Sequence, residues 1–135
     1  MTKDQFLEVI APRLKDISSA DKSILEKSFP NGMVKAHYCV RRWDNADGGT
    51  VQYYVLTDTY FVDLTIKSHS ITVRQIKLQV EIIEKSYKIE RMPQLSLEPM
   101  NIILRLKDTE PIHLLKPDQA ELENYQEFLK SLLDL

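Results

Sequence analysis

Apolar and polar residues alternate through the middle of the chain, between residues 33 and 117, and a period of two predicts β-strands. Alternating stretches cover residues 33–43, 50–57, 60–67, 71–82, 102–106 and 112–114, and residues 83–90 are a further β-rich stretch. Asp47-Gly48-Gly49 predicts a hairpin between the first two, because glycine tolerates the backbone angles of tight turns. We therefore expect about seven antiparallel strands.

The alternation changes phase after residue 74. Between Arg74 and Ile76 the apolar positions shift by one residue, which predicts a bulge, a bend or the start of a new strand. Residues 91–99 contain two prolines and are expected to form a loop.

Both ends of the chain have helical spacing instead. Residues 1–30 form a predicted helical extension: Thr2 and Gln5 match a capping box, and Pro12 interrupts the helix. Residues 118–135 carry one apolar stripe of helical period, so we expect an amphipathic C-terminal helix. Asp118 and Glu121 have the spacing of a second capping box. The predicted class is α+β, in a single domain spanning residues 1–135.

Composition narrows the class of protein. With 135 residues, 43% hydrophobic, the chain is long enough for one core. Its 18 basic and 20 acidic residues nearly cancel, which gives no reason to expect nucleic acid as a partner. No apolar run is long enough to span a bilayer, and the charged N-terminus is unlike a signal peptide. Cys39 is the one cysteine, so we expect a cytoplasmic protein without an internal disulfide.

The order of seven strands followed by a capping helix resembles the pleckstrin-homology-like (PH-like) superfold. The segment 55–62, VLTDTYFV, looks like a turn found in bacterial PH-like domains, although Tyr60 stands where that family usually has a basic residue. The resemblance covers roughly residues 33–135. It implies a strongly bent sheet or barrel with a helix across its open end. The alternative is a cystatin-like or NTF2-like cone, a fold that usually places its helix before the sheet.

Few residues carry a recognisable chemistry. His37 and Cys39 share a strand face, but i,i+2 side chains lie about 7 Å apart, too far for a direct hydrogen bond. His37, Cys39, His69 and His113 lack metal-ligand spacing, and the oxygen-rich segment 44–49 lacks the EF-hand pattern. The three glycines form no phosphate-binding loop. We expect no cofactor, no metal and no enzymatic activity.

A second set of apolar residues, on the other face of the predicted strands, is more informative about function than these polar residues. If the odd-numbered residues of 51–55 face the core, then the neighbouring aromatic and aliphatic positions face outward. One explanation is that the N-terminal helices cover this face. The other is an aromatic surface that binds a protein partner or a second copy of the chain, or an exposed sheet edge that accepts a strand. The predicted partner-binding residues are Trp43, Tyr54, Leu56 and Phe61.

Two other functions stay open. A peripheral membrane-lipid binder would use the basic residues that PH-like domains place at the base of the first hairpin and in the loop between the third and fourth strands. Here roughly those places hold Lys35, Arg41, Arg42 and Lys67. An NTF2-like hydrolase or ligand-binding domain would need a deep pocket lined by polar residues such as Asp63, His69 or Tyr87. The acidic residues of the neighbouring loops would repel an inositol phosphate. The expected function is therefore a non-enzymatic interaction module.

Overall fold

The computed structural model describes residues 1–13, 19–29, 33–45, 48–67, 70–91 and 97–134. Its helices are α1 (Lys3–Ile10), η1 (Ala11–Arg13), α2 (Ser19–Ser28), η2 (Gln119–Glu121) and α3 (Leu122–Leu133). Its strands are β1 (Val34–Asn45), β2 (Gly48–Thr57), β3 (Tyr60–Ile66), β4 (Ile71–Lys77), β5 (Ile82–Arg91), β6 (Leu97–Leu106) and β7 (Ile112–His113).

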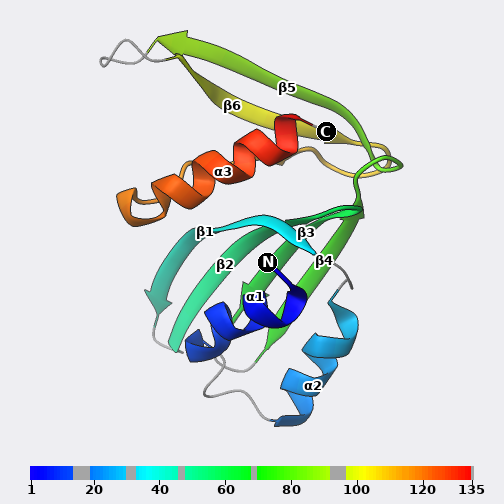
Figure 1. Ribbon diagram of the computed structural model, residues 1–135, viewed down its shortest axis with the longest axis vertical. Coiled ribbons are helices and arrows are strands. Elements are labelled where there is room, and N and C mark those ends of the chain that lie inside the picture. Colours follow the sequence, from blue (N-terminus) through cyan, green and yellow to red (C-terminus); the bar gives the residue numbers. More distant parts are fainter. Residues whose placement is uncertain (14–18, 30–32, 46–47, 68–69, 92–96, 135) are drawn as a thin grey trace.

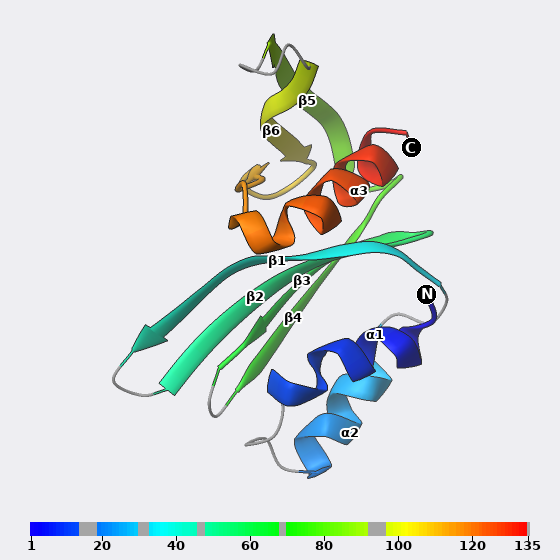
Figure 2. The same ribbon diagram turned by 60° about the vertical axis from the view of Figure 1, so that its left-hand side comes forward.

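The strands form two antiparallel sheets, in the orders β1-β2-β3-β4 and β5-β6-β7. In Figure 1 and Figure 2 the four-stranded sheet is the central layer, with α1 and α2 on one face. On its other face lie α3 and, beyond it, the three-stranded sheet. The α+β class is thus confirmed. Neither strand order closes among the described residues, so the expected alternative of a closed barrel is not present.

Both faces of β2, in the middle of the four-stranded sheet, are buried from Val51 to Thr57. The odd-numbered residues of β2 pack under α1 and α2, and the even-numbered residues pack under α3. The helix-side cluster comprises Phe6, Ile10, Leu25, Phe29, Val34, Cys39, Val51, Tyr53, Val55, Val62, Leu64 and Ile66. The α3-side cluster includes Ala36, Tyr38, Val40, Tyr54, Leu56, Phe61, Ile76, Ile102, Leu104, Tyr125, Phe128, Leu129 and Leu132.

This arrangement corrects the prediction that the N-terminal helices cover the second apolar set of the strands. The N-terminal helices do not cover Tyr54, Leu56 and Phe61; α3 does. The wide apolar stripe of α3 supplies Phe128, whose ring lies 5.9 Å from Phe61 and 5.0 Å from Tyr38. Each helical layer therefore buries one parity of the same strands, and the sheet has no solvent face over β2.

The phase shift in β4 has a different cause from the one expected. Pairing with β3 is regular from Tyr60–Lys77 to Ile66–Ile71, without a bulge, and the strand continues through Arg74 and Ile76. Ile71 and Val73 pack on the helix-side cluster, whereas Ile76 belongs to the α3-side cluster. The apolar pattern changes parity because successive parts of one strand serve opposite faces of the sheet.

The two predicted capping boxes have different outcomes. At α1, the backbone N–H of Gln5 donates to Thr2 Oγ1 and the Thr2 N–H donates to Gln5 Oε1, as predicted. At the C-terminal end, a 3-10 turn comes first, and the Asp118 side chain makes no capping hydrogen bond. The α-helix begins only at Leu122, so the second capping box is wrong.

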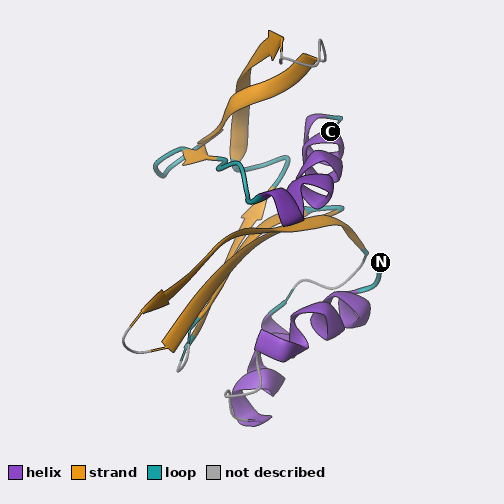
Figure 3. Ribbon diagram, turned by 90° about the vertical axis from the view of Figure 1, so that its left-hand side faces the viewer, coloured by secondary structure: helices purple, strands orange, loops and turns teal. Residues whose placement is uncertain are grey.

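The hairpin formed by β5 and β6, called here the β5–β6 arm, projects from the rest of the molecule. Its base packs over α3, and its strands continue away from the four-stranded sheet (Figure 3). Part of the loop expected at 91–99 is strand: β5 runs to Arg91 and β6 begins at Leu97. Residues 92–96 lie outside the described residues.

Candidate functional site

The arm carries the main cluster of exposed apolar side chains on one element. Ile83 is 59% exposed, Tyr87 46% and Ile89 57%. All three lie on β5, whereas the other exposed large apolar residues are scattered over separate elements. Burying such side chains against a partner is a favoured source of binding energy. The exposed face of β5 is therefore the strongest candidate for a binding surface.

The edge of β5 is also open for backbone pairing. Among the described strands β5 pairs with β6 alone, over residues 82–91. A strand edge presents a row of N–H and C=O groups that a further strand can satisfy. A ten-residue edge is thus available on the arm.

The other sheet edges are shorter or flanked. β7 has two residues, and β4 runs beside α2, where Gln75 Nε2 donates to the Ser28 carbonyl. β1 is bridged at its start by Met1 and Thr2, and the segment leading into α3 lies against its middle. Of the described edges, β5 is the long one that projects away from the helices (Figure 1).

Charges surround the apolar residues of β5. Glu84 pairs with Arg105 of β6 at 3.3 Å between Oε2 and Nε, and both side chains are largely exposed. Lys85 points the other way: its Nζ donates to the carbonyl of Leu132 in α3, at 3.1 Å. The pairing of β5 with β6 shifts between Ile82 and Glu84, and again between Ser86 and Lys88, where the extra residue belongs to β6. Alternation along β5 continues through that second shift and places Tyr87 and Ile89 on the Lys85 side of the arm.

The predicted aromatic surface does not lie at the surface. Tyr54, Leu56 and Phe61 are all buried beneath α3, so the exposure that this hypothesis required is contradicted. Burial, and secondarily the Asp63 carboxylate, raises the pKa of Tyr54 to about 12, so its phenol stays neutral at physiological pH. The side chain of Trp43 lies outside the described residues. Nothing in the sequence alone showed that α3 would take this face.

The predicted basic set is divided between two ends of the sheet. Arg41 and Arg42 are at the end of β1 where β2 begins, and Lys67 follows β3 at that same end. Lys35 lies at the opposite end, where its Nζ is 3.5 Å from Asp58 Oδ1. The step of seven positions from Lys35 to Arg42 corresponds to about 23 Å of strand. One phosphate-bearing headgroup cannot bridge that separation.

Arg41 belongs to a polar row across the strands instead. Its Nε donates to Gln52 Oε1 at 3.1 Å, and Gln52 Nε2 donates to Asp63 Oδ1 at 2.9 Å. Farther along the row, Arg74 Nη2 donates to Thr109 Oγ1, which links β4 to the β6–β7 turn. This row satisfies the buried amide of Gln52 and joins the two sheets, so a structural role accounts for it.

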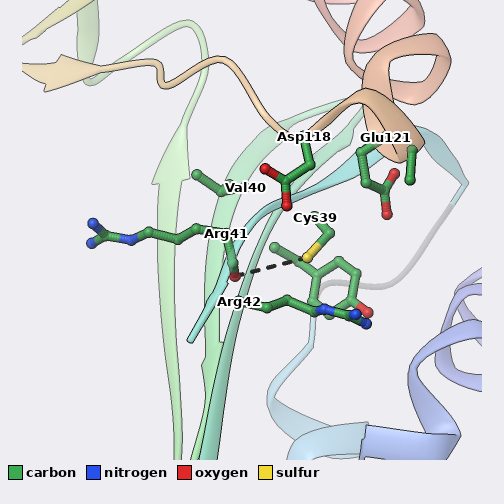
Figure 4. Close-up of a pocket in the computed structure, with 8 residues that line it drawn as sticks. Cys39, Val40, Arg41, Arg42, Asp118 and Glu121 are labelled. Carbon is green, nitrogen blue, oxygen red and sulfur yellow. Dashed lines mark hydrogen bonds between the residues drawn. The ribbon is translucent and has the colours of Figure 1, made fainter. Parts of the chain in front are cut away.

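A hollow of about 140 Å³ lies beside β1, between the strand and the 3-10 turn that precedes α3. Figure 4 shows Asp118 and Glu121 on the α3 side of this hollow, and Cys39 and Arg42 on the β1 side. The Cys39 thiol donates to the Arg41 carbonyl at 3.8 Å, so it is not directed to a base. The hollow is smaller than the pockets that ordinarily hold a substrate or cofactor.

His37 does not activate Cys39. Its ring packs against Phe6 at 5.2 Å, on the helix side of the sheet. Burial lowers the pKa of His37, against the opposing effect of Glu121 and with a smaller contribution from the N-terminal ammonium. Its buried Nδ1 has no hydrogen-bond partner within the described structure. The two side chains share a face, as predicted, without forming a nucleophile–base pair.

The remaining candidates also stay apart. In the described ranges, no three His, Cys, Asp or Glu residues are grouped as metal ligands. The polar set of the NTF2-like alternative does not converge: Asp63 is in the central sheet, Tyr87 is on the arm, and His69 lies outside the described residues. Most of the oxygen-rich segment 44–49 lies outside the described side chains.

A second hollow, of about 330 Å³, lies where the arm joins the body. Its lining combines three apolar with three polar residues: Leu78, Ile82, Leu132, Asp58, Gln79 and Lys85. The Lys85 ammonium donates to the Leu132 carbonyl, so this hollow lies where β5 and α3 contact each other.

Two findings concern the chain as a whole. None of the described helices combines the length and apolar character needed to cross a bilayer. Comparison with protein-family models, with curated proteins and with solved structures found no match to this chain.

Proposed function

We propose that the chain is a non-enzymatic interaction module that binds an extended protein segment by strand addition along β5. The observation that carries the proposal is a ten-residue strand that has one neighbour among the described strands and three exposed large apolar residues. Strand addition takes its affinity from main-chain hydrogen bonds and its specificity from side chains at alternate positions. β5 offers both, whereas Tyr54, Leu56 and Phe61 are buried.

The finer fold assignment is part of the same proposal. A four-stranded sheet, a three-stranded sheet and a C-terminal helix follow one another in the order that the PH-like superfold implies. We propose a PH-like relationship on this order, with α1 and α2 as an addition that covers the second face of the first sheet. The lone, buried Cys39 fits a reducing compartment, which supports a cytoplasmic site of action.

Selection of binding peptides tests the function directly. A phage-displayed library of random ten-residue peptides is panned against the full-length chain, and hydrogen exchange of the chain is measured with each recovered peptide. We expect peptides that slow amide exchange at residues 84–90. Recovered peptides that protect only other elements, or the absence of any peptide binding below about 100 μM, would overturn the proposal.

A matched pair of variants sharpens this test. Ile89→Ser removes an exposed apolar side chain from the arm, and Ile24→Ser removes one of similar exposure, 60%, from α2. Binding through β5 predicts at least a fivefold loss of peptide affinity for Ile89→Ser and less than a twofold change for Ile24→Ser. Equal losses in the two variants would contradict binding at this site.

A further inference from the structure

The sequence of β5 is suited to pairing with itself. In a two-fold symmetric antiparallel pair, the axis is perpendicular to the sheet, and one residue lies opposite its own copy. The possible registers are therefore defined by the residue on the axis. Within Ile82–Arg91, the registers that pair at least seven residues of each strand centre on Lys85, Ser86, Tyr87 or Lys88.

Charge separates these four registers. A centre at Lys85 or at Lys88 places a lysine opposite its own copy, and a centre at Tyr87 places Glu84 opposite Glu90. Like charges directly opposite one another destabilise a strand pair, whereas opposite charges stabilise it. The register centred on Ser86 avoids every such conflict, because Glu84 then lies opposite Lys88 of the second copy, twice by symmetry.

The remaining positions of this register are also complementary. Lys85 lies opposite Tyr87, so the lysine stem can pack along the aromatic ring. Ile89 reaches Ile83 of the second copy, which is the extra residue of β5 at the register shift between Ile82 and Glu84. Glu84 already has Arg105 at 3.3 Å, so Lys88 of the second copy would place this carboxylate between two cations.

We propose that the segment added along β5 is β5 of a second copy of the chain, in the antiparallel register with Ser86 on the two-fold axis. The two three-stranded sheets then form one continuous six-stranded sheet. Because the axis is perpendicular to that sheet, both four-stranded sheets lie on the same side of it. This inference rests on the proposed function and commits it to a self-complementary partner.

A competing explanation exists for the charges of β5. Edge strands often carry lysine and glutamate to prevent pairing with other chains. Such protection predicts a monomer at every concentration. The complementary register and the three exposed apolar residues favour pairing, and the experiment below separates the two explanations.

Disulfide trapping tests the register. Opposed residues of an antiparallel pair have Cα atoms about 4.5–5.5 Å apart, within the range that a disulfide spans. Under mild oxidation of the full-length chain, we expect Ser86→Cys to give a covalent dimer in more than half of the molecules. Ile89→Cys is the matched control, because Ile89 lies about 20 Å from its own copy in this register. The wild type, whose Cys39 is buried, is the background.

A charge exchange tests the same register without a cysteine. Lys88→Glu places Glu84 opposite a glutamate, and we expect the dimer to weaken at least tenfold in sedimentation equilibrium. Adding Glu84→Lys restores opposite charges, and the double variant is expected to return to within threefold of the wild-type dissociation constant. Circular dichroism of each variant checks that the fold is retained.

The outcomes distinguish this inference from the proposed function. A wild type that stays monomeric up to 1 mM overturns self-pairing, as does stronger cross-linking of Ile89→Cys than of Ser86→Cys, or a double variant no better than Lys88→Glu. If self-pairing fails but library peptides still slow amide exchange in β5, strand addition remains the proposed function, and the added strand comes from a different protein. If the chain neither pairs with itself nor binds peptides along β5, this inference and the proposed function are both overturned.

Discussion

The strands β2 and β5 are the same length and are stabilised in different ways. Every residue of β2 from Val51 to Thr57 is buried, because α1 and α2 cover one face and α3 covers the other. In β5, most residues are exposed, and its pairing with β6 is its one described strand contact. The body therefore depends on packing between layers, whereas β5 depends mainly on its pairing with β6.

This difference separates the two roles that apolar strand residues can have. Phe61 contributes to the stability of the body because both sheet and helix surround it. Ile89 contributes little to stability, since more than half of its side chain is in water, and it is available to a partner. A binding surface can thus evolve on the arm without disturbing the core that supports it.

The largest expected effect compares truncation of a buried ring with truncation of an arm residue. Phe61→Ala removes a fully buried ring that lies 5.0 Å from Tyr54 and 5.9 Å from Phe128. We expect the free energy of unfolding to fall by about 3–5 kcal/mol. Ile89→Ala should change it by less than about 0.5 kcal/mol. Urea unfolding at low protein concentration measures both, and comparable losses would contradict the division into body and arm.

A smaller effect comes from one buried hydroxyl group. Tyr38 is fully buried, and its Oη donates to the carbonyl of Leu115 at 3.1 Å. Tyr38→Phe should lower the free energy of unfolding by about 1 kcal/mol, because it removes this hydrogen bond. Tyr87→Phe on the arm serves as the control and should leave stability within about 0.5 kcal/mol of the wild type. A neutral Tyr38→Phe would show that the bond is not formed in solution.

The two helix starts are expected to differ by a similar amount. Thr2→Ala removes a side-chain cap that α1 uses, and the free energy of unfolding should fall by about 1 kcal/mol. Asp118→Ala removes a side chain without a capping bond, and the change should stay below about 0.5 kcal/mol. If thermal unfolding shows the larger loss for Asp118→Ala, the helix start given for the C-terminal segment is contradicted.

The smallest effect is a pH dependence that belongs to the body. Burial lowers the pKa of His37 below its usual 6.5, so the folded state binds a proton less readily than the unfolded state. Its contribution to stability is therefore complete above pH 6.5 and is lost as the pH falls below that value. We expect the urea midpoint of His37→Gln to decline less than that of the wild type between pH 7.5 and pH 5. Parallel declines would show that His37 does not contribute.

Local features of this fold could be predicted from the sequence, and the layer assignments could not. The Thr2–Gln5 cap depends on four adjacent residues. The predicted pairing of β1 with β2 is also confirmed, although Gly48 and Gly49 belong to β2 and Asp47 lies outside the described residues. Alternation located the strands but did not decide which helix covers each face. In β2, aromatic or aliphatic residues at both parities, such as Tyr53 and Tyr54, already indicated two buried faces.

The candidate site was harder to predict for a related reason. Ile82, Ile83 and Ile89 look like core residues in sequence, and only Ile82 packs against the body. Whether a strand edge is covered depends on the placement of helices distant in sequence. The exposed edge was expected as one of two binding surfaces, but no local pattern identified β5 as its location.

Hydrogen exchange of the full-length chain at two protein concentrations tests the central claim most directly. If β5 pairs with a second copy, amides of residues 84–90 should exchange at least tenfold more slowly at 500 μM than at 1 μM. Amides of β2, enclosed by the body, should be equally protected at both concentrations. Exchange of β5 that does not depend on concentration would contradict self-pairing, and loss of protection in β2 at 1 μM would contradict a body that is stable by itself.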